Sequence, residues 1–356
     1  MILAVNVGST SVKMTLENFS GSLKHTNFPL QIGSRETLFT SSCFMAEVKN
    51  LEPKVMEFLS TNGITLSKVT IIVSRGGLQR PGTAGAYLIN RSMCNDLCQG
   101  IYGHHPSSLG PVLAFILAER ADCRAYVIDP PSTDEFSDLA RLSGIPEIRR
   151  ESAFHALSHK AVGRRAAAEL GKSYDQCRLV VAHLGGGITI GAHDRGQVVD
   201  CTHGLSEGPF SPERAGSLPT LELLKIPTDH PSGNCQTEKK LVGEGGLQAY
   251  LGTKDALEVE SRISEGDKQA ALVYEAMAYQ TAKDIAAMAA VLAGEVDAVV
   301  LTGSLAKSSL LLEWITARVA FLGPILVYPG EGEMDALLAA AHRILGGEEE
   351  WITYEH

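Results

Sequence analysis

The same short pattern occurs twice in this chain, and it constrains the fold more than any other feature. In both copies an apolar strand is followed by a polar residue, an apolar residue, a glycine, two small residues and a second alternating stretch. The copies cover residues 5–12 and 182–189, about 177 positions apart. Each predicts a β-hairpin whose tight glycine turn exposes backbone N–H groups. Two such turns indicate a duplicated architecture with halves that face a common cleft, or else two unrelated hairpins.

Short apolar segments alternate with helical segments along the whole chain. We expect strands near residues 2–7, 69–74, 125–129, 179–184, 297–302 and 324–328, and helices near 51–62, 108–121, 156–170, 268–294 and 334–345. Because parallel strands need helical crossovers, this order predicts an α/β fold with substantial parallel pairing. A length of 356 residues favours two domains. We place the boundary between the halves near Arg150.

The charge balance restricts the partners of the protein. The chain has 31 basic and 41 acidic side chains, a net charge of -10, and no run rich in lysine or arginine. Nucleic acid and anionic membrane surfaces are therefore not expected as partners, and any anionic ligand must be bound by a few local cations. Seven irregularly spaced cysteines favour reduced thiols. With no secretory signal and no apolar run long enough to span a bilayer, we expect a cytoplasmic protein.

Three glycine turns are candidates for binding phosphate or nucleotide. Small residues let the backbone N–H groups approach an anion closely, and Lys13 could add a positive charge to the first turn. Gly303 follows an apolar strand and precedes a helix expected near residue 307, an arrangement found at nucleotide sites and also in ordinary tight connections. None of the turns has P-loop or Rossmann spacing. The other turn residues are Gly8, Ser9, Thr10, Gly185, Gly186 and Gly187.

Two arginines and several histidines stand beside turn residues. A guanidinium can hold a carboxylate or phosphoryl group with two parallel hydrogen bonds, which suits Arg75 and Arg214, although either could form a surface ion pair. His155 and His159 have a spacing that could bind zinc, but the glutamate of the H-E-x-x-H motif is missing. His183 ends a buried strand, where it could donate to a phosphoryl group or be satisfied by the backbone.

Carboxylates at strand ends are candidates for a magnesium site. Magnesium needs one or two carboxylates besides phosphate oxygens and water, if a nucleotide is bound. Asp129 follows an apolar strand, and Glu331 or Glu333 lies in a glycine-rich turn. Asp255 is a further acidic residue at a turn. Each of them alone could instead cap a helix or face solvent.

Five motifs occur in an order that resembles the acetate and butyrate kinase family. They are NVGSTSVK at 6–13, VSRGG at 73–77, FHAL at 154–157, AHLGGGI at 182–188 and FSPER at 210–214. The resemblance covers nearly the whole chain, and the second, third and fourth motifs look like the butyrate branch. The wider superfamily shares the fold of the sugar kinases and of the heat-shock and actin ATPases.

The resemblance implies a fold and a reaction. The fold is α/β, with two ribonuclease-H-like domains of duplicated topology around an interdomain nucleotide cleft. The acyl-side domain would comprise residues 1–150 and a returning C-terminal helix in 336–356, and the nucleotide-binding domain residues 151–335. The reaction would be reversible, magnesium-dependent phosphoryl transfer between ATP and butyrate, giving ADP and butyryl phosphate. We also expect a homo-oligomer, a dimer or larger.

Roles for individual residues follow from the same resemblance. Arg75 and Arg214 would hold the carboxylate and the phosphoryl group in flight, while His155 and His183 would stabilise its oxygens. The cofactor-binding residues would be Asn6, Gly8, Ser9, Thr10, Lys13, Gly185, Gly186, Gly187, Asp255 and Gly303; the acyl substrate would contact Gly77, His105, Phe154 and Pro212 besides Arg75; and Asp129 and Glu333 would orient magnesium.

The acyl chain length has one sequence cue and several alternatives. Gly76 and Gly77 stand where the acetate branch carries bulkier valines, so we expect room for extra methylenes, each contributing about 0.8 kcal/mol when buried. A branched fatty acid, or one of another length such as propionate or acetate, is an alternative substrate. A non-catalytic nucleotide-sensing protein of the same fold and, more distantly, a zinc hydrolase are the alternative functions.

Overall fold

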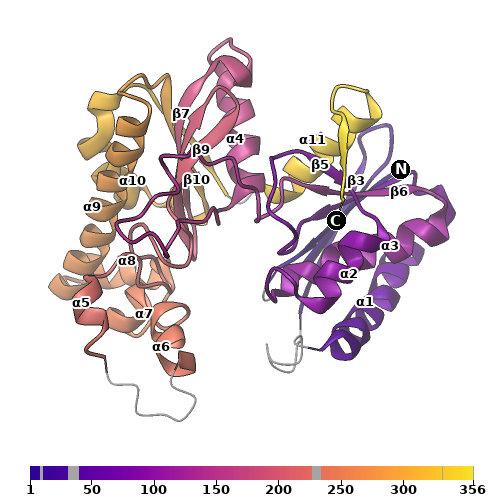
Figure 1. Cartoon of the computed structure of the whole chain (residues 1–356), viewed down its shortest axis with the longest axis horizontal. Helices are drawn as coiled ribbons and strands as arrows, with labels where there is room; N and C mark the ends of the chain where they lie inside the picture. The colour runs from indigo at the N-terminus through magenta and orange to yellow at the C-terminus, as the bar shows by residue number, and fades with distance from the viewer. Residues whose placement is uncertain (9–10, 31–39, 227–233, 331, 356) are drawn as a thin grey trace. The chain divides into compact units, whose positions relative to one another are not determined.

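The computed structural model describes residues 1–8, 11–30, 40–226, 234–330 and 332–355, without the side chains of 234–236. The chain forms two compact units (Figure 1). Unit 1 comprises Met1–Thr133 and Gly332–His356, and unit 2 comprises Asp134–Glu331. In the described ranges no helix is both long enough and apolar enough to cross a bilayer.

Unit 1 contains a seven-stranded sheet in the order β12-β5-β6-β4-β1-β2-β3. Strands β1 and β2 pair antiparallel, while β1, β4 and β6 run parallel. The strands are β1 (Ile2–Val7), β2 (Ser11–Glu17), β3 (Leu23–Pro29), β4 (Ile71–Arg75), β5 (Ala86–Leu88), β6 (Arg124–Ile128) and β12 (Trp351–Thr353); the helices are α1 (Ser41–Thr61), α2 (Arg91–Gln99), α3 (Leu109–Ala121) and α11 (Glu333–Leu345), with 3-10 turns η2 (Leu66–Lys68) and η3 (Pro106–Ser108).

The two faces of strand β1 serve different purposes. Every residue of β1 is buried, as expected for the centre of a sheet covered on both faces. Leu3, Val5 and Val7 join the core that α1 and α3 complete. Because side chains alternate along a strand, Asn6 projects to the opposite face, where α11 packs on β1 and β4. A polar side chain from the first strand thereby lies at the start of the last helix.

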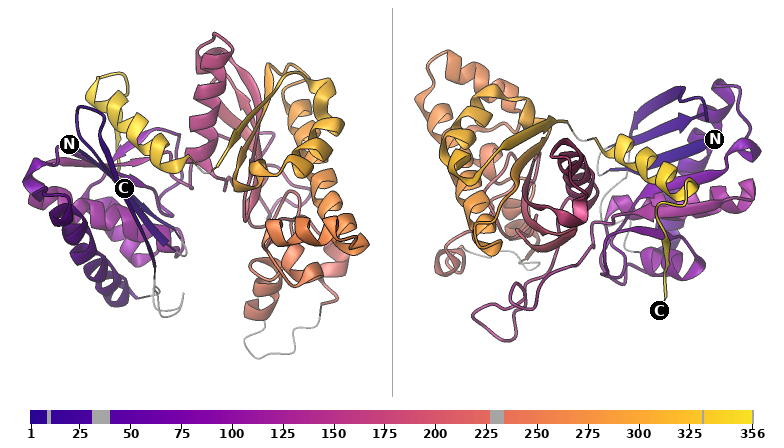
Figure 2. Two further views of the ribbon diagram at one scale, coloured as in Figure 1. Left: turned by 180° about the vertical axis from the view of Figure 1, so that it is seen from behind. Right: turned by 90° about the horizontal axis from the view of Figure 1, so that it is seen from above.

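Unit 2 contains a five-stranded sheet in the order β11-β10-β7-β8-β9. Figures 1 and 2 show α9 and α10 on one face of this sheet and α4 on the other. The strands are β7 (Arg178–Leu184), β8 (Ile188–Asp194), β9 (Gln197–Cys201), β10 (Ala298–Gly303) and β11 (Ile325–Pro329); the helices are α4 (Ala156–Glu169), α5 (Thr220–Leu223), α6 (Asn234–Leu241), α7 (Gly246–Leu251), α8 (Ala256–Ser264), α9 (Lys268–Val291) and α10 (Ser309–Val319), with 3-10 turns η4 (Tyr174–Gln176), η5 (Ser304–Lys307) and η6 (Ala320–Leu322).

The two sheets share one topology. In each, three antiparallel strands in reverse chain order continue into two parallel strands: β3-β2-β1-β4-β6 in unit 1 and β9-β8-β7-β10-β11 in unit 2. Both predicted hairpins are present as β1–β2 and β7–β8. The prediction of an α/β fold with duplicated, ribonuclease-H-like domains is therefore confirmed. The short elements β5, β12, α2 and α5–α8 were not expected from the sequence.

The unit boundaries differ from those drawn on the sequence, at residue 150 and between 335 and 336. Residues 134–150 belong to unit 2, because Glu135 Oε2 accepts hydrogen bonds from Lys160 Nζ at 2.6 Å and from the Val198 N–H at 2.7 Å. Phe136 packs with Phe154 in the same small core. The start of α11 belongs to unit 1. These boundaries are set by contacts between residues far apart in the chain, which a local sequence pattern cannot predict.

Candidate functional site

The glycine turn between β7 and β8 is packed against an arginine. A Cβ on Gly187 would overlap the guanidinium of Arg214, so only glycine leaves room for that side chain. Arg214 Nη1 donates to the Gly204 carbonyl at 2.6 Å. Ser211 Oγ donates to the Gly186 carbonyl at 2.6 Å and ties the turn to the segment that carries Arg214. The backbone of a tight turn and a guanidinium, two groups that bind anions, thus lie together in unit 2.

Two imidazoles stack at the edge of this turn. The rings of His155 and His183 have centroids 4.1 Å apart and planes inclined by 15°. Each is held by a hydroxyl: His155 Nδ1 lies 2.9 Å from Thr189 Oγ1, and His183 Nδ1 lies 2.9 Å from Ser158 Oγ. The structure therefore brings the two histidines together, as the resemblance implies.

A cavity opens from the glycine turn. It has a volume of about 490 Å³, and Gly186, Asp255 and Ser304 are among its lining residues. Apolar side chains supply much of the wall, and Lys254 pairs with Glu213 at 3.0 Å in the same lining. An apolar cavity of this size with a few polar groups is typical of a small-molecule site. The cavity joins a candidate phosphate-binding turn to space large enough for a nucleoside.

Three predicted site residues, Gly186, Asp255 and Pro212, line this cavity, and Gly303 immediately precedes the lining residue Ser304. Asp255 caps helix α8, its Oδ1 accepting from the Leu257 N–H at 2.9 Å. Gly303 ends β10 with a φ of 95°, and a Cβ there would overlap the Leu184 carbonyl, so the strand can lead into η5 only through glycine. Pro212, which the resemblance gives to the acyl substrate, lines the same cavity as Asp255. Phe154 is buried and meets the His159 ring edge-on.

Unit 1 contains a second polar cluster, formed by Asn6, Arg75 and Glu333. Asn6 Nδ2 donates to Glu333 Oε2 at 2.7 Å, and Arg75 Nη1 lies 3.1 Å from Glu333 Oε1. Asn6 is 3% exposed and Glu333 9%. Glu333 is the first residue of α11, where a carboxylate also interacts favourably with the helix dipole. The sequence analysis assigned these three residues separately, to the cofactor, the substrate carboxylate and magnesium, and in the structure they lie together.

Magnesium is the metal that the resemblance implies, and the donors in this cluster fit it. Asn6 Oδ1 is buried and has no hydrogen-bond partner among the residues that the structure describes. Together with the Glu333 carboxylate it provides oxygen donors, the chemistry that magnesium prefers. No group of three or more His, Cys, Asp or Glu side chains in the described ranges could hold a metal. These two oxygen donors therefore fit a magnesium ion whose remaining ligands are phosphate oxygens and water.

The glycines after Arg75 do not leave room for extra methylenes, and that expectation is wrong. A Cβ on Gly76 would come within 2.6 Å of the Pro130 side chain, and one on Gly77 within 2.5 Å of Ser108. The backbone of residues 76–77 packs directly against these neighbours. Glycine is required here for close packing of the chain on itself, so these positions carry no information on acyl chain length.

The remaining predicted residues of unit 1 are placed as follows. Asp129 is buried with a φ of 38°, and its Oδ1 accepts from the Gly85 N–H at 2.9 Å. His105 Nδ1 accepts from the Ser107 N–H at 3.1 Å and caps η3. Lys13 lies opposite Asn6 in the β1–β2 pairing, and the Gly8 N–H donates to the Ser11 carbonyl at 2.8 Å. Ser9, Thr10 and Glu331 lie outside the described residues.

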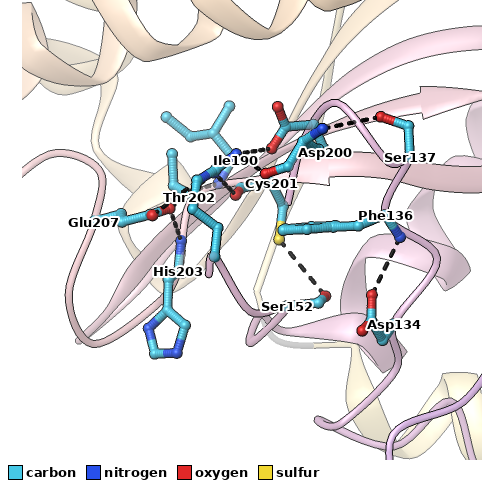
Figure 3. A network of polar contacts seen from close by, with 12 residues as sticks. Asp134, Phe136, Ser137, Ser152, Ile190, Asp200, Cys201, Thr202, His203 and Glu207 are labelled. Atoms are coloured by element: carbon cyan, nitrogen blue, oxygen red, sulfur yellow. Dashed lines mark hydrogen bonds and ion pairs between the residues drawn. The ribbon is translucent and has the colours of Figure 1, made fainter. Parts of the chain in front are cut away.

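Arg150 organises the loop that follows β9, a role that the sequence did not indicate. Its Nε and Nη2 donate to the two carboxylate oxygens of Glu207 at 2.9 Å each, and its Nη1 donates to Asp200 at 2.9 Å. Figure 3 shows Glu207 accepting from the His203 N–H, and Thr202 accepting from the Ile190 N–H, within the same network.

Burial and ion pairing act in opposite directions on the two carboxylates of this network. Burial raises the pKa of Asp200 although Arg150 opposes it. Burial also acts to raise the pKa of Glu207, but the hydrogen bonds from Arg150 and His203 outweigh it and lower that pKa. The loop fixed in this way includes Gly204, whose carbonyl accepts from Arg214. Arg150 therefore supports the position of Arg214 from a distance.

Comparison with known proteins places the chain in a family. The model of the acetokinase family matches residues 143–327, just over half of the 356 residues. The chain belongs to the acetokinase family. Family membership puts it among the kinases whose phosphoryl acceptor is a carboxylate. The matched range includes the glycine turn, Arg214, both stacked histidines and the cavity at Asp255.

Solved structures of acetate and propionate kinases share the fold. The acetate kinase of Porphyromonas gingivalis has a TM-score of 0.75 at 18% identity, covering 97% of this chain and 99% of that one. A propionate kinase from Francisella tularensis subsp. tularensis SCHU S4 has a TM-score of 0.73 at 21% identity, covering 94% and 97%. The acetate kinase of Entamoeba histolytica has a TM-score of 0.71 at 16% identity, covering 96% and 98%.

Proposed function

We propose that this acetokinase-family protein catalyses reversible, magnesium-dependent phosphoryl transfer between ATP and butyrate, giving ADP and butyryl phosphate. The observation that carries the proposal is the packing of Arg214 on the glycine turn of unit 2, beside the stacked pair His155 and His183. A loose phosphoryl transition state spreads negative charge over its oxygens and needs cations and N–H donors rather than a protein nucleophile. This cluster consists of such groups.

Each group in unit 2 has a proposed role. The backbone N–H groups of residues 185–187 bind the nucleotide phosphates, and the adjoining cavity holds the nucleoside between Asp255 and Ser304. Arg214 neutralises the charge that develops on the phosphoryl group, with two donors on one planar group. His155 and His183 donate to its oxygens. The butyrate carboxylate attacks the γ-phosphorus, and the bond from that phosphorus to the β–γ bridging oxygen of ATP breaks.

Unit 1 supplies the acceptor side in this proposal. Arg75 binds the substrate carboxylate through guanidinium hydrogen bonds, and its present partner Glu333 keeps it in place. Asn6, Glu333 and Asp129 are the residues that would hold magnesium and its waters. The metal, when bound, neutralises phosphate charge and orients the phosphoryl group. Asn6 contributes the buried amide oxygen described above.

The preference for butyrate rests on the form of the motifs FHAL and AHLGGGI. An assay of ATP-dependent acyl hydroxamate formation over straight and branched C2 to C6 carboxylates tests it directly. We expect the highest kcat/KM with butyrate. A higher value with isobutyrate, propionate or acetate would replace butyrate as substrate but leave the reaction class intact.

The second candidate function is a nucleotide sensor without turnover. The cavity at Asp255 favours nucleotide binding in either case. Hydroxamate formation and ATP binding measured by calorimetry on the same sample separate the two. ATP binding without turnover of any carboxylate would exclude the kinase and support the sensor.

A further inference from the structure

A row of buried side chains leads from His155 into the interior of unit 2. Thr189 Oγ1 lies 2.9 Å from His155 Nδ1 and 3.0 Å from His159 Nε2. The other ring nitrogen of His159, Nδ1, lies 3.3 Å from His193 Nε2. His193 Nδ1 lies 2.7 Å from the hydroxyl of Tyr174. A continuous hydrogen-bonded chain therefore connects the proposed catalytic His155 to Tyr174 of η4, which packs against α4.

Burial favours the neutral form of the two inner histidines. His159 and His193 are each 0% exposed, and burial lowers the pKa of both imidazoles well below the usual value. Nearby positive charge adds to the effect, Lys160 acting on both rings. A neutral imidazole has one N–H and one bare nitrogen. At the contact between these rings one nitrogen must donate and the other must accept, which also decides the role of the second nitrogen of each ring.

The Thr189 hydroxyl has two acceptor lone pairs and one proton, and the described residues offer it no third hydrogen-bond partner, so its proton must go to His155 or His159. Only two orders of protons then satisfy the whole chain. In the first, Tyr174 donates to His193, which donates to His159, which donates to Thr189. The Thr189 hydroxyl then donates its single proton to His155 Nδ1, and neutral His155 carries its own proton on Nε2. In the second order every donor and acceptor is exchanged, and the His155 proton lies on Nδ1. The tautomer of His155 is thereby linked to Tyr174, from which three residues of the hydrogen-bonded chain separate it.

The tyrosine end selects the first order. A phenol is a stronger acid than an imidazole N–H, so the Tyr174 hydroxyl is the better donor at this contact. The length of 2.7 Å is usual for an O–H donor and short for an N–H donor. Lys160 Nζ and the Arg164 guanidinium lie 5.7 Å and 5.8 Å from the centre of the Tyr174 ring. These positive charges strengthen the phenol as a donor and weaken it as an acceptor.

We propose that Thr189, His159, His193 and Tyr174 are positioning residues that hold His155 as the tautomer with its proton on Nε2. In that tautomer Nδ1 is used by Thr189, and Nε2 can donate to a phosphoryl oxygen. The catalytic use of the Nε2 proton rests on the proposed kinase function, whereas the tautomer does not. Neither His159 nor His193 needs to contact a substrate for this role.

Nitrogen NMR of the full chain tests the tautomer without any turnover. With histidine labelled by ¹⁵N at pH 8, the signals of His155 are identified by their loss in His155→Gln. We expect the wild type to show the Nε2–H pattern. Tyr174→Phe removes the terminal donor and should introduce the Nδ1–H pattern, with kcat about tenfold lower and KM for ATP unchanged.

Matched variants separate this effect from a general loss of packing. Tyr328→Phe removes a hydroxyl that donates to Glu169 at an equal 2.7 Å in the same unit, and should leave the His155 signals and kcat at wild-type values. Thr189→Val should disturb the tautomer as Tyr174→Phe does, and Thr189→Ser, which restores a hydroxyl, should recover it. An unchanged Nε2–H pattern in both Tyr174→Phe and Thr189→Val would overturn the proposal. A shifted tautomer in a protein that phosphorylates no carboxylate would retain the chain and reject the kinase.

Discussion

Asn6 donates a hydrogen bond of 2.7 Å to the carboxylate of Glu333, and 327 positions separate the two residues in the chain. The contact joins the central strand of unit 1 to its last helix. Arg75 approaches the same carboxylate at 3.1 Å, so one acidic group holds two proposed ligand-binding side chains in position. The pairing explains why a glutamate begins α11 and why a buried strand carries an asparagine.

Glu333→Gln should weaken both the fold of unit 1 and the use of magnesium. Glutamine can still accept from Asn6 but removes the charge opposite Arg75. We expect the free energy of unfolding to fall by about 1–2 kcal/mol, measured by urea denaturation, since hydrogen bonds to charged groups contribute about 1.5–3 kcal/mol when well buried. The magnesium concentration for half-maximal activity should rise. Asp335→Asn, an exposed change in the same helical turn, should cost only the helix-dipole contribution of about 0.3–1 kcal/mol and leave the magnesium requirement unchanged.

Two neighbouring glycines should respond very differently to a methyl group. In Gly187→Ala the new Cβ meets the Arg214 guanidinium, and the arginine must move. We expect kcat to fall at least about 100-fold, the effect of losing one preorganised donor. In Gly186→Ala the Cβ lies 3.6 Å from Glu213 Oε1, an ordinary contact that leaves Arg214 in place. We expect a much smaller fall in kcat than in Gly187→Ala, together with a higher KM for ATP, because this turn is proposed to bind the nucleotide phosphates. Equal losses in both variants would show that the turn, and not Arg214, is affected.

Removing Arg214 itself should abolish transfer but retain the nucleotide. Arg214→Ala is expected to lower kcat by about 10³–10⁵, the range for an arginine that stabilises phosphoryl transfer. ATP affinity measured by calorimetry should change little, because the nucleoside cavity remains. Arg318→Ala, which removes a guanidinium paired with Glu275 on α9, serves as the control with wild-type kcat. A loss of ATP binding as large as the loss of kcat would contradict this role.

Asp255 has two roles, as a helix cap and as a proposed nucleoside ligand, and two substitutions separate them. Asp255→Ala removes both functions, whereas Asp255→Ser retains a hydroxyl that can cap α8. We expect both variants to raise the KM for ATP by about tenfold or more, as for the loss of a charged hydrogen bond. Only the alanine variant should lose about 1 kcal/mol of stability. Normal ATP affinity in the serine variant would show that Asp255 only caps α8 and does not bind the nucleoside.

The stability of unit 2 should fall in mild acid because of His159 and His193. Their folded-state pKa values lie well below those of the unfolded chain, so below about pH 6.5 the unfolded state binds more protons. The stability is fully present above pH 6.5 and is lost as the pH falls toward the folded-state values. The slope is about 1.4 kcal/mol per pH unit for each histidine.

Urea unfolding at intervals between pH 8 and pH 5 measures this slope. The double variant His159→Gln with His193→Gln should show a flatter profile across that range, even where its stability at pH 8 is lower. An equally steep profile in the double variant would assign the acid sensitivity to other groups.

The sequence alone determined the architecture of this protein. The alternation of strands and helices and the repeated hairpin pattern depend on the period of apolar residues and on turn chemistry, which are properties of near neighbours. They predicted an α/β fold and the turn at residues 185–187 and indicated a duplicated architecture, while the family resemblance implied the duplicated ribonuclease-H-like topology. The ordered motifs also placed His155 and His183 in one candidate site, and the structure stacks their rings.

Only the tertiary structure decided what individual residues do in that architecture. Gly76 and Gly77 suggested space for a substrate, but Pro130 and Ser108 fill it. His159 suggested a zinc ligand, but it joins Thr189 to His193. The physical reason is the same in each case: the partners come from segments far away in the chain, and their distance and burial follow from how the sheets and helices pack. A local pattern records which groups are present, whereas folding determines which groups meet.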